Sequence, residues 1–183
     1  MRLTEAILGA KKLITHANCM DGLATAMIVR DALPDIPIEF VQYNTPEYLA
    51  LKPEPGVIFC DVVPAQGKPD EVSAWAAAGA VMLDHHKENR DIVEACGALG
   101  VFADEKTEPG VSGAVLAQRH VWTAVLGTEP SERERLVHEF ARLVGTRDTW
   151  QKTIVIGPEG RVPNKEWLPA LALHEVLAKY RVK

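Results

Sequence analysis

The sequence alternates short apolar runs with longer segments in which apolar residues recur at helical spacing. The runs are too short for helices, and their continuous apolar character indicates strands buried on both faces. Strands separated by helical segments form βαβ units, which build parallel sheets. The sequence therefore predicts an α/β fold with a doubly wound, mostly parallel sheet of about five strands flanked by helices. The expected strands are residues 12–15, 38–43, 57–60, 80–83 and 100–102.

Helical patterns fill the segments between the strands and most of the chain after them. Pro34 ends the first of these patterns, because proline cannot continue a helix. The chain beyond residue 102 reads as mostly helical, with one extended piece at residues 153–156. The expected helices are residues 22–33, 69–78, 113–126, 131–143 and 167–180.

Length, charge and cysteine content exclude several classes of protein. The 183 residues suit one domain with its own core, and no apolar run approaches the roughly 18 residues of a membrane-spanning helix. A net charge of −5 without a cluster of Lys and Arg argues against binding duplex DNA. The three cysteines form no Cys-x-x-Cys pair, which indicates reduced thiols and a cytoplasmic protein.

Polar residues follow three of the expected strands at the point where each strand ends. His16 follows the first strand, Asp61 the third, and Asp84, His85 and His86 the fourth. Ligands bind at the carboxyl edge of parallel sheets, so we expect these side chains to converge there. Imidazole and carboxylate donors together predict a metal site with mixed nitrogen and oxygen ligands.

Some of these residues also have purely structural interpretations. Asp21 precedes a helical segment and could be its N-cap, and Asp61 could cap or turn the chain with Pro64. Ser112 lies in a pattern similar to a nucleophile elbow, but no strand precedes it, so we expect a helix N-cap. The histidines in helical patterns are expected to be structural or exposed; these are His120, His138 and His174.

Five short motifs occur in the order found in the DHH phosphoesterase superfamily. They are the segment 14–24 with His-Ala-Asn-Cys-Met-Asp-Gly, the turn 61–64, the Asp-His-His run in 83–87, and the segments 111–114 and 147–150. From about His16 to Trp150 the chain resembles this superfamily, in a divergent His-x-Asn-Cys-x-Asp-Gly branch. The superfamily includes exonucleases, nanoRNases, cyclic-dinucleotide phosphodiesterases, exopolyphosphatases and family II inorganic pyrophosphatases. Their shared chemistry is manganese-dependent hydrolysis of phosphate esters or anhydrides.

The resemblance implies a centre of two Mn²⁺ ions. It assigns His16 and Asp21 to one ion, Asp61 to both as a bridge, and His85 and Asp148 to the second. Histidine nitrogen and carboxylate oxygen suit Mn²⁺ better than the soft thiolate sets that select zinc.

The Asp-His-His run supplies further candidates. Asp84 would orient a histidine or act as a further metal ligand, and His86 would face the substrate phosphate as a hydrogen-bond donor or general acid. Lys87 would either assist with the phosphate charge or remain a solvated surface lysine.

The first motif departs from the commonest pattern of the superfamily. Met20 stands where relatives carry an aspartate, Asp21 comes one residue later, and a second carboxylate is missing. Cys19 and Asn18 are the neighbouring residues that could ligate a metal or support a ligand, and the number of bound ions stays open.

The segment after the last motif is short. We expect a catalytic core at residues 1–150 and a C-terminal extension at 151–183, which contains a helix and no full cap domain of the kind that closes over the site in most relatives. The apolar residues of this helix could pack on the chain's own core, on a second copy in a homodimer, or on another protein.

The predicted function is hydrolysis of phosphodiester bonds in short nucleotides or oligonucleotides by a metal-activated water. An inorganic pyrophosphatase or polyphosphatase is the alternative within enzymes. A phosphate-binding regulatory module with weakened catalysis is the alternative outside them.

Overall fold

The computed structural model describes residues 1–66, 68–128, 131–151, 153–155 and 161–177. Its centre is a five-stranded, all-parallel sheet with the order β2-β1-β3-β4-β5, which confirms the predicted α/β fold. The strand order reverses direction between β1 and β3, as in doubly wound sheets. The strands are β1 (Lys12–His16), β2 (Ile38–Val41), β3 (Val57–Cys60), β4 (Val81–Asp84) and β5 (Gly100–Phe102).

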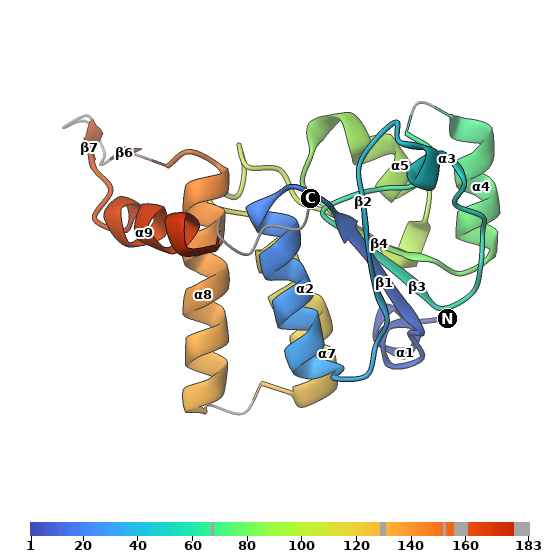
Figure 1. Cartoon of the computed structure of the whole chain (residues 1–183), viewed down its shortest axis with the longest axis horizontal. Coiled ribbons are helices and arrows are strands. Elements are labelled where there is room, and N and C mark those ends of the chain that lie inside the picture. Colours follow the sequence, from blue (N-terminus) through green and yellow to red (C-terminus); the bar gives the residue numbers. More distant parts are fainter. Residues whose placement is uncertain (67, 129–130, 152, 156–160, 178–183) are drawn as a thin grey trace.

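Helices cover both faces of this sheet (Figure 1). One face carries α1 (Leu3–Leu8), α2 (Met20–Ala32), α6 (Gly113–Leu116), α7 (Thr123–Leu126) and α8 (Glu132–Asp148). The other face carries α3 (Pro46–Leu49), α4 (Pro69–Ala77) and α5 (Arg90–Glu94).

The central strand β3 shows why the sheet is buried on both sides. Ile58 and Cys60 belong to the core under α2 and α8, whereas Phe59 belongs to the core under α4. The Phe59 ring meets the Trp75 ring edge to face, with centroids 4.9 Å apart. A strand between two apolar layers needs apolar residues at every position, which is the pattern read from the sequence.

The expected helix at 113–126 is one continuous helical segment with a change of winding inside it. Residues Ala117–Trp122 adopt a π-helical conformation between α6 and α7. The Thr123 hydroxyl donates a hydrogen bond to the Gln118 carbonyl over 3.0 Å. Ser112 is the N-cap of α6, as expected, and its hydroxyl accepts from the Val115 amide.

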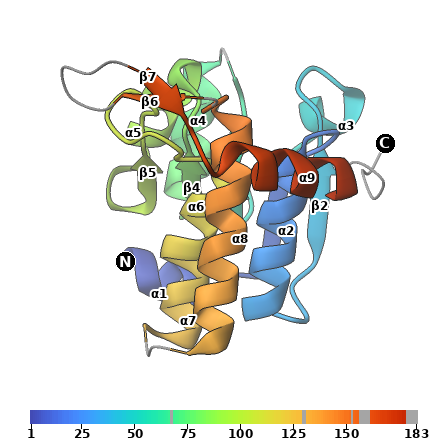
Figure 2. The same ribbon diagram turned by 90° about the vertical axis from the view of Figure 1, so that its left-hand side faces the viewer.

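The C-terminal part adds a strand pair and a helix. β6 (Thr153–Val155) pairs antiparallel with β7 (Arg161–Pro163), and α9 (Trp167–Leu177) follows. Figure 2 shows α9 crossing α8 and α2, and its Leu173 and Leu177 side chains join the core beneath it. The helix therefore packs on the chain's own core; residues 156 and 178–180 of the expected elements lie outside the described residues.

Several short elements of the described part of the chain were not expected from the sequence, among them α1, α3, α5 and β7. Each spans six residues or fewer, too few to establish a hydrophobic period. None of the described helices combines the length and apolar character needed to cross a membrane.

Candidate metal centre

The candidate centre lies at the carboxyl edge of the sheet. β3 pairs with β1 on one side and β4 on the other, with Thr15 opposite Cys60 and Cys60 opposite Leu83. The residues that follow this level are His16, Asp61 and Asp84, and the pair His85–His86 comes directly after Asp84 at the same edge. Because β3 is the middle strand, Asp61 lies between the two histidine positions.

Two loop residues at this edge have left-handed backbone conformations. Asn18 has φ 57° and Asp61 has φ 66°. Asn and Asp tolerate this region better than other non-glycine residues, and such conformations cluster at functional sites. The Asp61 amide donates to the Leu83 carbonyl over 3.1 Å, which fixes the turn that aims its carboxylate.

Asp21 is held by the start of a second helix and does not cap its own. The N-cap of α2 is Cys19, and the Asp21 carboxylate instead accepts hydrogen bonds from the Gly113 amide over 2.5 Å and the Ala114 amide over 2.8 Å. A Cβ on Gly113 would lie 2.5 Å from Cβ of Asp61, so only glycine permits this approach of α6. The N-cap interpretation of Asp21 is therefore wrong.

The His85 imidazole lies among three carboxylates. Its Nε2 atom is 3.4 Å from Oδ1 of Asp61, 3.6 Å from Oδ2 of Asp21 and 3.7 Å from Oδ2 of Asp148. These separations are long for hydrogen bonds and close to the ~3 Å spacing of neighbouring ligand atoms around one octahedral divalent ion. His85 is only 8% exposed and Asp61 only 1%.

Asp148 reaches the site from the helical layer. It is the last residue of α8, and its side chain is 28% exposed. A carboxylate at a helix C-terminus faces the negative end of the helix dipole, an unfavourable place without a cation nearby.

The electrostatics of the protein's own groups favour added positive charge. Burial and the charge of Asp21 raise the pKa of Asp61 well above its usual range, and the same causes raise the pKa of Asp148 to about 6. Although burial lowers it, contacts with Asp21 and Asp61 raise the pKa of His85 to about 11. Burial and Asp61 also raise the pKa of the Cys19 thiol.

Several buried polar atoms at this edge have no hydrogen-bond partner. They are both ring nitrogens of His16, both carboxylate oxygens of Asp61 and Nε2 of His85. Burying such atoms without partners is costly, and metal coordination would satisfy them. Burial also lowers the pKa of His16, which favours the neutral imidazole that binds metals. The residues therefore fit divalent cations with a preference for nitrogen and oxygen donors, such as Mn²⁺.

The structure divides the donor atoms differently from the division that the resemblance implies. Asp21 groups with His85 and Asp148, and His16 groups with Cys19 and Asp61, with all donor atoms in each group within 4.8 Å of one another. The cause lies at the start of α2, where Asp21 turns toward α6 while Cys19, two residues earlier, stays beside His16. A further group joins Asp61, His85 and His86.

Asp84 is engaged by neighbouring donors. Its Oδ1 atom accepts from the His86 amide over 2.6 Å and lies 2.9 Å from His86 Nδ1, and Oδ2 accepts from the Asn89 side chain over 3.3 Å. Although burial lowers it, the bond to Asp84 raises the pKa of His86 to about 9. Asp84 therefore orients His86, one of the two roles expected for it.

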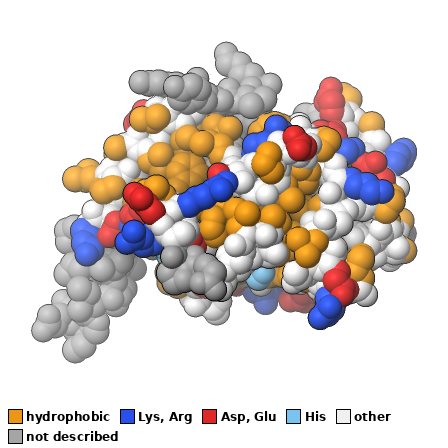
Figure 3. Space-filling view, turned by 90° about the horizontal axis from the view of Figure 1, so that it is seen from below, with side chains coloured by type: hydrophobic (Ala, Val, Ile, Leu, Met, Phe, Trp, Pro, Cys, Tyr) orange, Lys and Arg blue, Asp and Glu red, His pale blue; other side chains and the backbone are white. Residues whose placement is uncertain are grey.

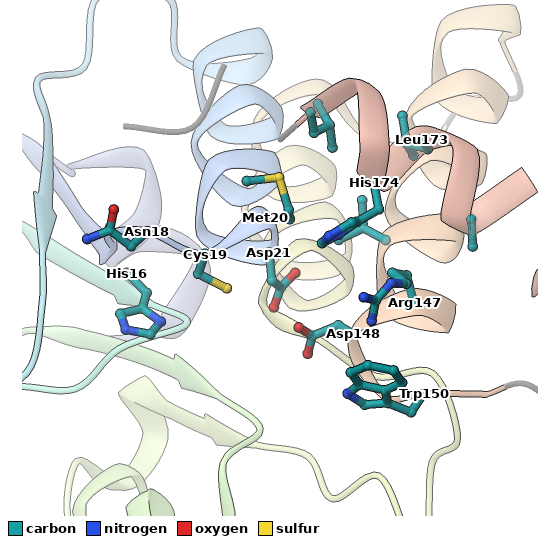
Figure 4. Close-up of a pocket in the computed structure, with 13 residues that line it drawn as sticks. His16, Asn18, Cys19, Met20, Asp21, Arg147, Asp148, Trp150, Leu173 and His174 are labelled. Carbon is teal, nitrogen blue, oxygen red and sulfur yellow. The ribbon is translucent and has the colours of Figure 1, made fainter. Parts of the chain in front are cut away.

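A cavity of about 370 Å³ opens beside the centre (Figure 4). It is bounded by the first motif, by the end of α8 and by α9. Arg147 is the one Lys or Arg among its described lining residues, and its guanidinium lies 4.2 Å above the Trp150 ring and 5.6 Å from the Trp167 ring. Trp150 is 62% exposed.

The lining adds residues that sequence reasoning missed and leaves out several that it named. His174 lines the cavity, so the expectation that it has no part in the site needs correction. Its place depends on how α9 docks, for which the sequence carries no local signal. Arg147 and Trp150 belong to the last motif, and their closeness to Asp148 in the sequence could have identified them as site residues. Lys87 is exposed and does not line the cavity, and four further predicted residues of the neighbouring centre do not line it either: Asp61, Asp84, His85 and His86.

No family model, curated protein or solved structure matches this chain.

Proposed function

We propose that the protein is a divalent-metal-dependent phosphoesterase that hydrolyses phosphodiester bonds in short nucleotides or oligonucleotides, as the DHH superfamily it resembles does. The observation that carries this proposal is the set of buried, unpartnered histidine and carboxylate atoms at the carboxyl edge of the sheet. We also place the protein in the cytoplasm, because its three cysteines are odd in number and form no Cys-x-x-Cys pair.

Different groups of ligand residues would bind the metal ions. His85 stands against Asp21, Asp61 and Asp148, and Asp61 also reaches the group of His16. Mn²⁺ held by these residues would supply Lewis-acid polarisation of the phosphate and would lower the pKa of a water molecule. The buried carboxylates keep this centre in place and exclude bulk water from one side of it.

We assign to His86 the role of general acid, which donates a proton to the leaving oxygen. Asp84 holds its Nδ1 atom at 2.9 Å, which leaves Nε2 to face the substrate. A histidine whose pKa is raised to about 9 carries its proton at neutral pH and can donate it to the oxygen that departs.

The cavity beside the centre supports a nucleotide substrate. Stacking on Trp150 and Trp167 holds the Arg147 guanidinium flat, and its planar fork suits a phosphate group. The exposed ring of Trp150 offers a stacking surface for a base. One arginine at this cavity favours short substrates over long strands.

The test is hydrolysis by metal-depleted protein to which Mn²⁺, Mg²⁺ or Ca²⁺ is returned. Bis(p-nitrophenyl) phosphate, linear dinucleotides, cyclic dinucleotides and pyrophosphate are the substrates. We expect EDTA to abolish diester hydrolysis and Mn²⁺ to restore it best. His85→Ala and Asp61→Asn should each abolish turnover, while the exposed controls His138→Ala and Asp35→Asn retain it.

Other outcomes overturn the proposal in distinct ways. Chelator-insensitive hydrolysis rules out the metal centre. Activity on pyrophosphate alone makes the protein a pyrophosphatase, and metal binding without turnover makes it a phosphate-binding module.

We also propose self-association through α9. Its Leu168 and Val176 side chains are exposed although apolar. Sedimentation velocity should show a dimer that Leu168→Glu weakens; a monomer at all concentrations contradicts this proposal.

A further inference from the structure

Two of the three donor groups, those that do not contain His86, are called here the outer donor groups, and they differ in the kinds of donor atom that they offer. The group Asp21, His85 and Asp148 offers one nitrogen and two oxygens, whereas the group His16, Cys19 and Asp61 offers one nitrogen, one sulfur and one oxygen. The sulfur is the donor that distinguishes the second group. Thiolate is a soft ligand that favours zinc, while carboxylates and imidazole accommodate manganese.

The Cys19 side chain is available to a metal. Cys19 is the N-cap residue of α2, yet its side chain makes no capping hydrogen bond. In Figure 4 its sulfur lies between the His16 ring and the Asp21 carboxylate, and its donor atom is within 4.8 Å of those of His16 and Asp61.

The partners of Cys19 point independently to a ligand. Asp61 is 1% exposed, and both of its carboxylate oxygens are buried without a hydrogen-bond partner. Both ring nitrogens of His16 are also buried without a hydrogen-bond partner. A small buried thiol that merely packs would not explain why a buried carboxyl group and an imidazole lie beside it without hydrogen-bond partners.

The other two thiols show the contrast. Cys60 Sγ lies 3.3 Å from the Gly113 carbonyl, and Cys96 Sγ lies 3.3 Å from the Met82 sulfur. Both therefore have uncharged contacts within the core. Among the described cysteines, Cys19 alone belongs to a group of metal-ligating side chains.

We propose that the centre is mixed, with a zinc ion bound by His16, Cys19 and Asp61 and the manganese ion bound by Asp21, His85 and Asp148. The inference rests on the proposed function for the manganese half only. When zinc binds, the Cys19 S–H bond breaks, the sulfur bonds to the metal, and the proton passes to the buffer.

The test uses the metal-depleted full-length protein and Co²⁺ as a spectroscopic substitute for zinc. We expect a near-ultraviolet thiolate-to-cobalt charge-transfer band that one equivalent of Zn²⁺ removes and Mn²⁺ does not. Cys96→Ala is the matched control and should keep the band. Cys19→Ser and Cys19→Ala should both lose it and bind Zn²⁺ about 100-fold more weakly.

A further variant probes selectivity. Cys19→Asp replaces the soft donor with a hard one, so it should reduce the preference for Zn²⁺ over Mn²⁺ in calorimetric titrations. Circular dichroism of each variant verifies folding, and the spectrum of the unmodified protein tests the proposal without any variant.

Failure of this inference differs from failure of the proposed function. Absence of the band in the unmodified protein, or its survival in Cys19→Ser, overturns the zinc site even if the protein hydrolyses diesters with Mn²⁺. A Cys19-dependent band in a protein that hydrolyses nothing supports the zinc site and overturns the esterase.

Discussion

Asp61 is the residue on which the donor groups converge. It belongs both to the group of His16 and Cys19 and to the group of His85 and His86. Its left-handed backbone and its place after the central strand produce this position together. The donor group that a residue at this edge joins therefore depends on the direction in which its backbone points the side chain.

Asp84 provides a test of how His86 is oriented. Asp84→Asn removes the charge that holds the imidazole proton, so kcat should fall about 100-fold for a dinucleotide with its poor leaving group. The loss should be smaller for bis(p-nitrophenyl) phosphate, whose leaving group needs no proton. Steady-state kinetics on both substrates measure the difference.

The control for that prediction is the exposed Asp35→Asn, with metal content measured in both variants. Equal losses on the two substrates would contradict a proton-donating role for His86.

The sequence predicted where the site residues lie along the chain better than it predicted which groups they contact. His16, Asp61 and His85 follow buried apolar runs, and the geometry of parallel strands brings such residues together. The side of the centre that Asp21 joins depends on two amides of α6, about 90 residues away in the chain. No local pattern encodes that contact.

At the scale of elements, three helices meet around the centre. α2 supplies Cys19 and Asp21, α6 binds the Asp21 carboxylate, and α8 ends at Asp148. The apolar pattern located these helices but ended the third at residue 143, five residues before α8 ends at Asp148. It could not predict the π-helical stretch after α6 or the one-turn helices, because those depend on packing against distant parts of the chain.

Gly113→Ala tests the close approach of α6. The added Cβ would lie 2.5 Å from Cβ of Asp61 and 3.0 Å from Oδ2 of Asp21, so α6 must move and weaken its bonds to Asp21. We expect Mn²⁺ affinity to fall about ten-fold, measured by calorimetry. Gly9→Ala is the control, since its nearest contact would be an ordinary 3.4 Å. Unchanged affinity in Gly113→Ala would contradict this account.

Asp31 joins three helical segments far from the centre. Its carboxylate accepts from Trp122 Nε1 over 2.7 Å and from the Arg133 guanidinium over 2.9 and 3.1 Å. We expect Asp31→Asn to lower the free energy of unfolding by about 1 kcal/mol at pH 7, in urea titrations with EDTA present.

The same contact predicts a pH dependence. The bonds from Arg133 lower the pKa of Asp31, so the ionised form stabilises the fold above the ordinary aspartate pKa of about 3.9. That contribution is lost as the pH falls through the lowered value. The difference in stability between the unmodified protein and Asp31→Asn should therefore shrink below about pH 4. A difference that persists at lower pH would contradict an ionic origin.

At the scale of the whole molecule, the distribution of charge argues against long polyanions as substrates of the proposed enzyme. On the face seen in Figure 3, Lys and Arg side chains are interspersed with Asp and Glu. The chain carries a net charge of −5, so successive phosphates of a long strand find little attraction.

An oligonucleotide length series tests this limit. We expect kcat/KM to level off at about five nucleotides, because the contacts end at the cavity with Arg147 and Trp150. Trp150→Ala should raise KM for dinucleotides about ten-fold through lost stacking and change KM for pyrophosphate less. Efficiency that keeps rising to 20-mers would reveal an extended binding surface.

The two outer donor groups draw on very different lengths of chain. His16, Cys19 and Asp61 are all present once the residue after β3 has been synthesised, whereas Asp21 and His85 wait for Asp148 at the end of α8. As the chain emerges from the ribosome, the sulfur-containing group can therefore assemble once β1, β3 and β4 have paired, because the Leu83 carbonyl of β4 fixes the Asp61 turn. The all-nitrogen-and-oxygen group needs the helical layer to dock on a sheet that already exists. The order of synthesis thus presents the donor set suited to zinc before the one suited to manganese.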